Sequence, residues 1–191
     1  SHTQWTPPVE PGITGKRLGI MGAGGIGTAI AVAAKSFGVE VIGLNSDGRA
    51  VEGFAACYPS ADRLVFAEGI DYLVSVLPQT AQTENLIDHE VLTRLNPRAI
   101  VINAGRGNAV VEADLIASLN AGHLRAAVLD VFRVEPLPPD DPLWSTPGVH
   151  ITSHTAGPTP DEAVAEVFER NLQRYIAVEP LTDAVRSGRG Y

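Results

Sequence analysis

Short apolar runs alternate with helix-length segments along this chain from residue 16 onward. The apolar runs are nearly continuous and rich in β-branched residues, which is typical of strands buried on both faces of a parallel sheet. We expect strands at residues 17–21, 40–44, 72–77, 99–104, 126–131 and 149–153. We expect helices at residues 26–37, 89–95, 112–121 and 160–177. The alternation predicts an α/β fold with a doubly wound parallel sheet and right-handed crossovers, although residues 45–71 follow no clear pattern.

Charge and cysteine content exclude several classes of protein. The 191 residues fit one full domain, and 22 acidic against 14 basic residues give a net charge of −8. This balance argues against a nucleic-acid-binding surface and against a basic face for membranes. The single cysteine, Cys57, cannot form an intramolecular disulfide, and no apolar run reaches the roughly 18 residues of a membrane helix. We therefore expect a cytoplasmic domain without nucleic-acid or membrane partners.

The first expected strand leads into a glycine-rich turn at residues 22–27 (GAGGIG), which reads G-x-G-x-x-G and opens the first expected helix. In such a turn Gly22 permits the sharp bend, Gly24 lets the backbone approach a pyrophosphate, and Gly27 lets the helix pack closely on the strand. The start of the helix adds unpaired N–H groups and a positive dipole. A tight turn without a ligand is the alternative. The context favours a dinucleotide site of the Rossmann type, formed by Gly22, Gly24, Gly25, Ile26 and Gly27.

The end of the second expected strand predicts which cofactor the site prefers. An acidic residue there would accept a hydrogen bond from the adenosine 2′-hydroxyl of NAD. This chain has Asn45 instead, followed by Ser46 and Arg49, which can bind a 2′-phosphate. Asp47 would repel a phosphate, but it is also a typical turn residue before Gly48. We therefore expect an NAD(P) site that uses Asn45, Ser46 and Arg49, with NADP slightly preferred over NAD.

Three further polar side chains follow three successive expected strands. Arg106 stands between two glycines after the fourth strand, Glu135 follows the fifth, and His154 follows the sixth. Each of them, taken singly, could be a solvated surface residue or an ordinary loop residue. Ligands bind beyond the carboxyl ends of parallel strands, so these side chains should meet at the rim where a nicotinamide would lie. The cation, the carboxylate and the imidazole together predict a catalytic site.

Four segments resemble motifs of the D-isomer-specific 2-hydroxyacid dehydrogenase family and occur in the family's order. They are residues 18–27 (LGIMGAGGIG), 101–107 (VINAGRG), 129–137 (LDVFRVEPL) and 152–157 (TSHTAG). The resemblance extends over nearly the whole chain and is strongest for the glyoxylate/hydroxypyruvate reductase branch. It implies a hydride transfer between NAD(P)H and a small 2-keto or 2-hydroxy acid of the glyoxylate or hydroxypyruvate type.

The resemblance also implies a role for each of four polar residues. Arg106 would bind the substrate carboxylate and polarise the keto oxygen, and His154 would protonate that oxygen as the general acid. Glu135 would hold the other imidazole nitrogen, where its negative charge stabilises the imidazolium. Asp130 would bind the nicotinamide carboxamide, or else it would hydrogen-bond the backbone of its own loop.

Further cofactor contacts are implied by the same motifs. They are expected at Leu77, Pro78, Thr83, Ala104, Gly105, Ala156 and Gly157. For residues 77–83 an ordinary strand-to-helix turn is the alternative. The remaining histidines have no partners at metal-ligand spacing, so we expect no metal site.

The family resemblance also divides the chain. Residues 1–16 are expected to be a linker from a substrate-binding domain that this chain does not contain. Residues 17–158 should form the NAD(P)-binding domain of a two-domain dehydrogenase, and residues 159–191 a helix and tail that return to the substrate domain. We expect a homodimer through the cofactor domain, and weak or no activity for the chain alone.

Other functions remain open at this point. Phosphoglycerate or another D-2-hydroxy acid is the alternative substrate within the same chemistry. A binding protein that senses the cofactor without turnover is the alternative from a different functional class. Such a sensor needs the glycine turn but needs no proton donor, so the presence of Arg106, Glu135 and His154 together argues against it. A methyltransferase on the same fold is disfavoured, because it would not use Arg106, Glu135 and His154.

Overall fold

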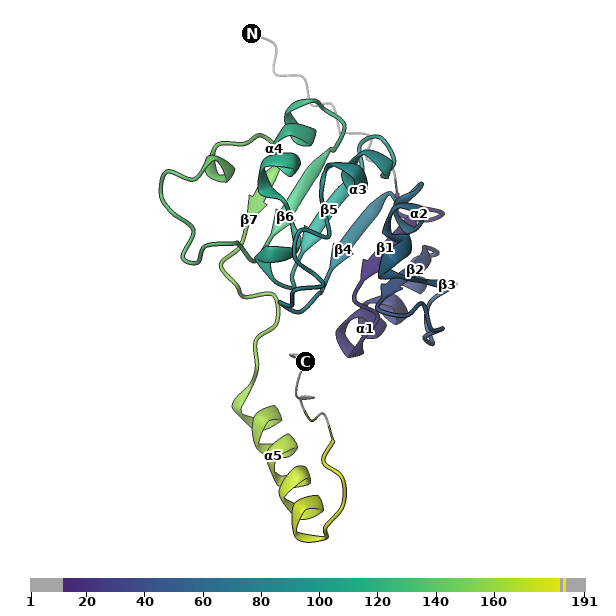
Figure 1. Cartoon of the computed structure of the whole chain (residues 1–191), viewed down its shortest axis with the longest axis vertical. Coiled ribbons are helices and arrows are strands. Elements are labelled where there is room, and N and C mark those ends of the chain that lie inside the picture. The colour runs from purple at the N-terminus through teal and green to yellow at the C-terminus, as the bar shows by residue number, and fades with distance from the viewer. Residues whose placement is uncertain (1–11, 183, 185–191) are drawn as a thin grey trace, which may run out of the picture.

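The structure is a computed structural model that describes residues 12–182 and residue 184 (Figure 1). The strands are β1 (Arg17–Met21), β2 (Glu40–Asn45), β3 (Ala56–Pro59), β4 (Tyr72–Ser75), β5 (Ile100–Asn103), β6 (Ala126–Leu129) and β7 (Val149–Ile151). The α-helices are α1 (Gly25–Lys35), α2 (Arg63–Ala67), α3 (His89–Arg94), α4 (Glu112–Asn120) and α5 (Asp161–Ile176). Short 3₁₀ helices are η1 (Ser60–Asp62), η2 (Gly107–Ala109) and η3 (Pro142–Trp144). Most of the expected linker and the end of the expected tail lie outside the described residues.

The seven strands of the described chain form one parallel sheet in the order β3-β2-β1-β4-β5-β6-β7. β1 pairs with β2 on one side and with β4 on the other, so the strand order reverses between β1 and β4. In open α/β sheets, ligands bind at such a reversal, beyond the carboxyl ends of the strands. The doubly wound Rossmann-type sheet expected from the sequence is confirmed.

The strand β3 lies in the segment for which the sequence showed no pattern. It is a short edge strand beside β2, and its side chains are half-buried or exposed. A strand of this kind has no buried apolar run from which it could be predicted. The strands β4 to β7 are also shorter than expected. For β4 and β6 the apolar run extends beyond the strand, because Leu77 and Val131 are buried in the loops that follow.

The side chains of β1, β2, β4 and β5 are divided between two hydrophobic clusters, one on each face of the sheet. In β1, Ile20 joins the cluster that contains Ala31 of α1. The next residue, Met21, joins the cluster that contains Phe66 of α2 and Leu92 of α3. The helices α2, α3 and α4 are packed against one another on that face (Figure 1). The face with α2, α3 and α4 is therefore well buried, whereas on the opposite face α1 packs on β1 and β2, and Ile102 and Val128 farther along are only half-buried. The loops at the carboxyl edge of the sheet remain accessible.

The helix α5 stands apart from the rest of the described chain (Figure 1). None of its residues is buried, and Val164, Phe168, Leu172 and Tyr175 expose apolar surface. Within the part of the chain that the structure describes, no helix has the length and apolar character that crossing a membrane requires.

Candidate active site

The glycine turn joins β1 to α1 at the carboxyl edge of the sheet. Gly22 has a φ of 107°, a left-handed conformation that favours glycine. A Cβ on Gly27 would lie 2.0 Å from the carbonyl oxygen of Gly22, so a side chain there would push the helix away from the turn. Gly24 and Gly25 face open space, and no side chain caps the start of α1. The first N–H groups of α1 therefore face an open position that fits the pyrophosphate of a dinucleotide.

The turn after β2 is held by its own side chains. Asn45 Oδ1 accepts a hydrogen bond from the N–H of Gly48 at 2.6 Å, and Asn45 Nδ2 donates to the carbonyl oxygen of Arg49 at 2.8 Å. The N–H of Arg49 donates to Asp47, and its guanidinium lies 3.4 Å from the same carboxylate. These contacts, led by the backbone N–H, lower the pKa of Asp47. Asn45 and Asp47 thus shape the turn, on which Ser46 and Arg49 are exposed.

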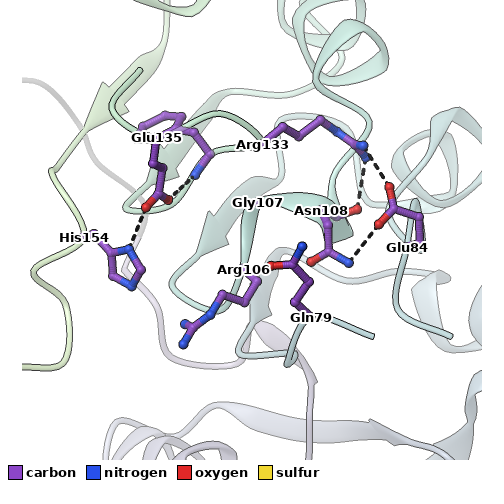
Figure 2. A pocket seen from close by; sticks show the side chains of 9 residues that line it. Gln79, Glu84, Arg106, Gly107, Asn108, Arg133, Glu135 and His154 are labelled. Atoms are coloured by element: carbon purple, nitrogen blue, oxygen red, sulfur yellow. Dashed lines mark hydrogen bonds and ion pairs between the residues drawn. The ribbon is translucent and has the colours of Figure 1, made fainter. Parts of the chain in front are cut away.

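His154 and Glu135 form a hydrogen-bonded pair. His154 Nδ1 lies 2.8 Å from Glu135 Oε2 (Figure 2). The other carboxylate oxygen accepts a hydrogen bond from the N–H of Phe132 at 2.9 Å. The hydrogen bond with His154, followed by that from Phe132, lowers the pKa of Glu135, so the carboxylate is ionised at neutral pH. With Nδ1 held by Glu135, Nε2 is the imidazole nitrogen that remains to face a substrate.

Arg106 lies in a loop that two glycines allow to pass close to its neighbours. A Cβ on Gly105 would lie 2.6 Å from the backbone nitrogen of Leu77, and a Cβ on Gly107 would lie 1.9 Å from the carbonyl carbon of Phe132. Both contacts are with backbone atoms, so neither position accommodates a side chain without a shift of the neighbouring loop. The Arg106 side chain is exposed and extends into the pocket (Figure 2), with Nη1 donating to the carbonyl oxygen of Gly105 at 2.7 Å.

Asp130 lies at the end of β6 and is 4% exposed. Its carboxylate accepts hydrogen bonds from the hydroxyl of Thr152 and from the N–H groups of Thr155 and Ala156, the last two at 2.9 Å. Its carbonyl oxygen accepts from the N–H of His154 at 2.8 Å. Burial would raise the pKa of Asp130, but the three hydrogen bonds to the carboxylate lower it. Asp130 therefore holds the His154 loop, and its contact with a nicotinamide carboxamide stays a prediction.

The loop after β4 is closed by a threonine. Thr83 Oγ1 donates to the carbonyl oxygen of Pro78 at 2.6 Å and accepts from the N–H of Thr80 at 3.0 Å. Leu77 is 7% exposed and anchors the start of the loop. Thr83 thus shapes this loop, as expected for the ordinary strand-to-helix turn that the sequence left open as an alternative. A cofactor contact by Leu77, Pro78 or Thr83 stays a prediction.

The remaining predicted cofactor residues lie along the same edge of the sheet. The N–H of Ala104, directly after β5, donates to the carbonyl oxygen of Ser75 at 3.0 Å. Ala156 and Gly157 are exposed beyond β7, and Ile26 is 67% exposed at the start of α1. Every predicted site residue therefore lies at the carboxyl end of a strand or in the segment that follows it.

A pocket of about 400 Å³ is lined by all three predicted catalytic residues. It is also lined by residues to which the sequence analysis gave no role, namely Gln79, Glu84, Asn108, Phe132 and Arg133. Phe132 and Arg133 lie inside the 129–137 motif, which was the one available signal for them. Within residues 12–182 and 184, no three His, Cys, Asp or Glu side chains are grouped in a way that could hold a metal ion.

Known proteins match this chain over nearly its whole length. The profile of the D-isomer specific 2-hydroxyacid dehydrogenase family, NAD binding domain, matches residues 2–156. The glyoxylate/hydroxypyruvate reductase A of Klebsiella pneumoniae is 36% identical over 193 residues, which cover 99% of this chain and 61% of the relative. The chain thus spans less than two thirds of the length of this curated relative.

Two solved structures are similar in fold and sequence. The NADPH-dependent glyoxylate/hydroxypyruvate reductase of Sinorhizobium meliloti, in complex with NADP and sulfate, superposes with a TM-score of 0.90 at 33% identity, covering 98% of this chain and 61% of that one. A D-isomer specific 2-hydroxyacid dehydrogenase of Xanthobacter autotrophicus, in complex with NADPH and MES, has a TM-score of 0.90 at 35% identity, covering 98% and 78%. By these matches, this chain belongs to the D-isomer specific 2-hydroxyacid dehydrogenase family and carries its NAD-binding domain.

Proposed function

We propose that this chain is the cofactor-binding part of an NAD(P)H-dependent reductase of small 2-keto acids, of the glyoxylate or hydroxypyruvate type. The observation that carries the proposal is the contact of 2.8 Å between His154 Nδ1 and Glu135 Oε2, in one pocket with Arg106. A protein that only senses the cofactor needs the glycine turn but gains nothing from a paired imidazole and an arginine. The names of the relatives support the substrate type.

The three side chains have complementary tasks in the proposed reaction. Arg106 binds the substrate carboxylate, which suits a planar and permanently charged guanidinium. His154 donates a proton from Nε2 to the keto oxygen during reduction, and accepts it in the reverse direction. Glu135 orients the imidazole and stabilises its protonated form.

The cofactor in this proposal is NAD(P), with NADP preferred. The bound nicotinamide would supply the hydride. The open start of α1 at Gly24 and Gly25 would hold the pyrophosphate, and Ser46 and Arg49 would bind the 2′-phosphate of NADP. The solved relatives that contain NADP or NADPH support this preference.

The exposed side of α5 supports a second domain in the working enzyme. Several large apolar side chains exposed on one helix normally mark a surface that another domain or chain covers. We propose that residues 17–158 form the cofactor domain and that residues 159–191 pack on a substrate-binding domain, to which residues 1–16 connect. We further propose that the enzyme is a cytoplasmic homodimer through its cofactor domains, and that closure over the substrate is needed for full activity.

The test is the substitution His154→Ala in the full-length protein. The reduction of a panel of keto acids that includes glyoxylate, hydroxypyruvate and a phosphorylated keto acid should fall about 10²- to 10⁴-fold, because the proton donor is lost. The dissociation constants of NADPH and NADH, measured by fluorescence titration, should change little. His150→Ala, four residues away on β7 and also exposed, is the matched control and should leave turnover unchanged.

Each other result has a definite meaning. Unchanged turnover in His154→Ala would refute the catalytic assignment. In the wild-type protein, tight cofactor binding without reduction of any acid would indicate the cofactor-sensing alternative. A preference of the wild-type protein for the phosphorylated keto acid would indicate a phosphoglycerate dehydrogenase.

A further inference from the structure

Arg133 lies on the wall of the catalytic pocket and has no part in the chemistry proposed above. Its Nε donates to the carbonyl oxygen of Val110 at 2.9 Å, and its Nη1 donates to Glu84 Oε1 at 3.0 Å. Its Nη2 donates to the carbonyl oxygens of Asn108 at 3.0 Å and Val110 at 2.8 Å, and to the side chain of Asn85. Each nitrogen of the guanidinium therefore donates to a protein acceptor, so this side chain is already engaged before any substrate binds.

The acceptors of Arg133 belong to two other loops of the site. Asn108 and Val110 lie directly after Arg106, in the loop that follows β5. Glu84 lies in the loop that follows β4, and Arg133 itself lies in the loop that carries Glu135. One side chain thus connects three loops at the carboxyl edge of the sheet (Figure 2).

Two further contacts join the same loops. A Cβ on Gly107 would lie 2.4 Å from the backbone nitrogen of Arg133, so the backbones of these loops touch. Asn108 Nδ2 donates to Glu84 Oε2 at 3.0 Å, and Asn108 is 7% exposed. The hydrogen bonds from Asn108 and then from Arg133 lower the pKa of Glu84, so a carboxylate faces the guanidinium at neutral pH.

Of the three loops that Arg133 connects, the loop after β5 carries Arg106 and the loop after β6 carries Glu135, which are both residues of the proposed reaction. A displacement of about 1 Å in such a site can reduce the rate about 100-fold. We propose that Arg133, with Glu84 as its charged partner, is a positioning residue that keeps Arg106 and Glu135 at their working separation. This inference rests on the proposed reductase function and adds how its site is held.

The first test is Arg133→Met in the full-length protein, since Met keeps much of the side-chain volume but donates no hydrogen bond. We expect kcat/KM for the keto acid to fall roughly 10- to 100-fold, with part of the loss in KM because Arg106 is displaced. The dissociation constant of NADPH should stay within about twofold, because the glycine turn that holds the pyrophosphate is not part of this network. Arg94→Met removes a comparable ion pair of 2.8 Å, to Glu68, outside the site and is the matched control.

A second readout does not depend on activity. Amide hydrogen exchange in residues 105–110 and 131–135 should become faster in Arg133→Met but not in Arg94→Met, while exchange in β1 and β4 stays unchanged. The milder substitution Glu84→Gln should act in the same direction with a smaller effect. In the double variant, Glu84→Gln should add little to Arg133→Met, because it acts through the same guanidinium.

The outcomes separate the two proposals. Normal exchange in both segments together with normal kcat/KM in Arg133→Met would overturn the positioning role. Additive effects of the two substitutions would refute the pairing with Glu84. Absence of keto-acid reduction in the wild-type protein would refute the reductase function, and the exchange rates would still decide whether Arg133 holds the loops.

Discussion

Asp130→Asn should destabilise the protein and loosen the loop that carries His154. The carboxylate of Asp130 is 4% exposed and accepts hydrogen bonds from three groups of that loop. An asparagine would keep one acceptor oxygen for Thr155 and Thr152. Its NH₂ group would face the N–H of Ala156, which now donates to Asp130 Oδ2 at 2.9 Å. Two donors would then meet at a buried position, which is the costly arrangement.

The size of the effect follows from these contacts. Losing a hydrogen bond to a charged acceptor and leaving a buried N–H without a partner costs about 2–4 kcal/mol. For a chain of this length the melting temperature falls by roughly 2–4 °C per kcal/mol, so we expect a decrease of roughly 4–16 °C at pH 7. Asp140→Asn, at an exposed position of the loop after β6, is the matched control and should change the free energy of unfolding by less than about 0.5 kcal/mol.

The pH dependence of the loss gives a second check. The folded state lowers the pKa of Asp130, so its ionised form stabilises the fold above the unfolded-state pKa of about 3.9. This contribution disappears as the pH falls through the lower pKa of the folded state. The difference between wild type and Asp130→Asn should therefore be full at pH 7 and should narrow below about pH 4. If the melting temperature of Asp130→Asn at pH 7 lies within about 2 °C of the wild-type value, the stabilising role of the Asp130 carboxylate is refuted.

Three further substitutions test the site. Glu135→Gln keeps an acceptor for His154 but removes the negative charge that the lowered pKa of Glu135 keeps present at neutral pH. Because this charge favours the protonated imidazole, reduction by the variant should fail at a lower pH than reduction by the wild type, and an upward shift in the kcat/KM profile would contradict this. Gly107→Ala should displace the Phe132 backbone by about 1 Å and lower kcat/KM about 100-fold, and normal kinetics would contradict the tight contact. Asp47→Asn should release the guanidinium of Arg49 from its ion pair. The dissociation constant of NADPH relative to that of NADH should then fall roughly two- to fivefold at low salt. An unchanged ratio would show that Arg49 does not reach the 2′-phosphate.

Sequence reasoning located the candidate site because its signals are local. The glycine turn is a pattern of six residues, and Arg106, Glu135 and His154 each follow an apolar strand within a few residues. In a parallel sheet all carboxyl ends lie at one edge, so residues far apart in the chain can be placed together without knowing the structure. The same reasoning missed β3, because an edge strand has no continuous buried run.

The use of individual side chains was harder to predict. Asn45 and Thr83 are expected at the cofactor, and the structure adds that their polar atoms hold their own turns. Arg133 had no assigned role, although it bonds to Glu84 across 49 positions of the sequence. Such contacts depend on how loops from different strands approach each other, which no local pattern encodes.

The amino-acid sequence by itself indicates most of the strands and helices, the dinucleotide turn and the three candidate catalytic side chains, because periodicity and turn chemistry act over a few residues. The pairing of His154 with Glu135, the buried contacts of Asp130 and the network around Arg133 arise only when the sheet brings the loops of β4 to β7 together. These contacts depend on packing between segments that are distant in the sequence. A hydrogen bond tolerates only a narrow range of donor–acceptor distances, so a displacement of about 1 Å makes or breaks it.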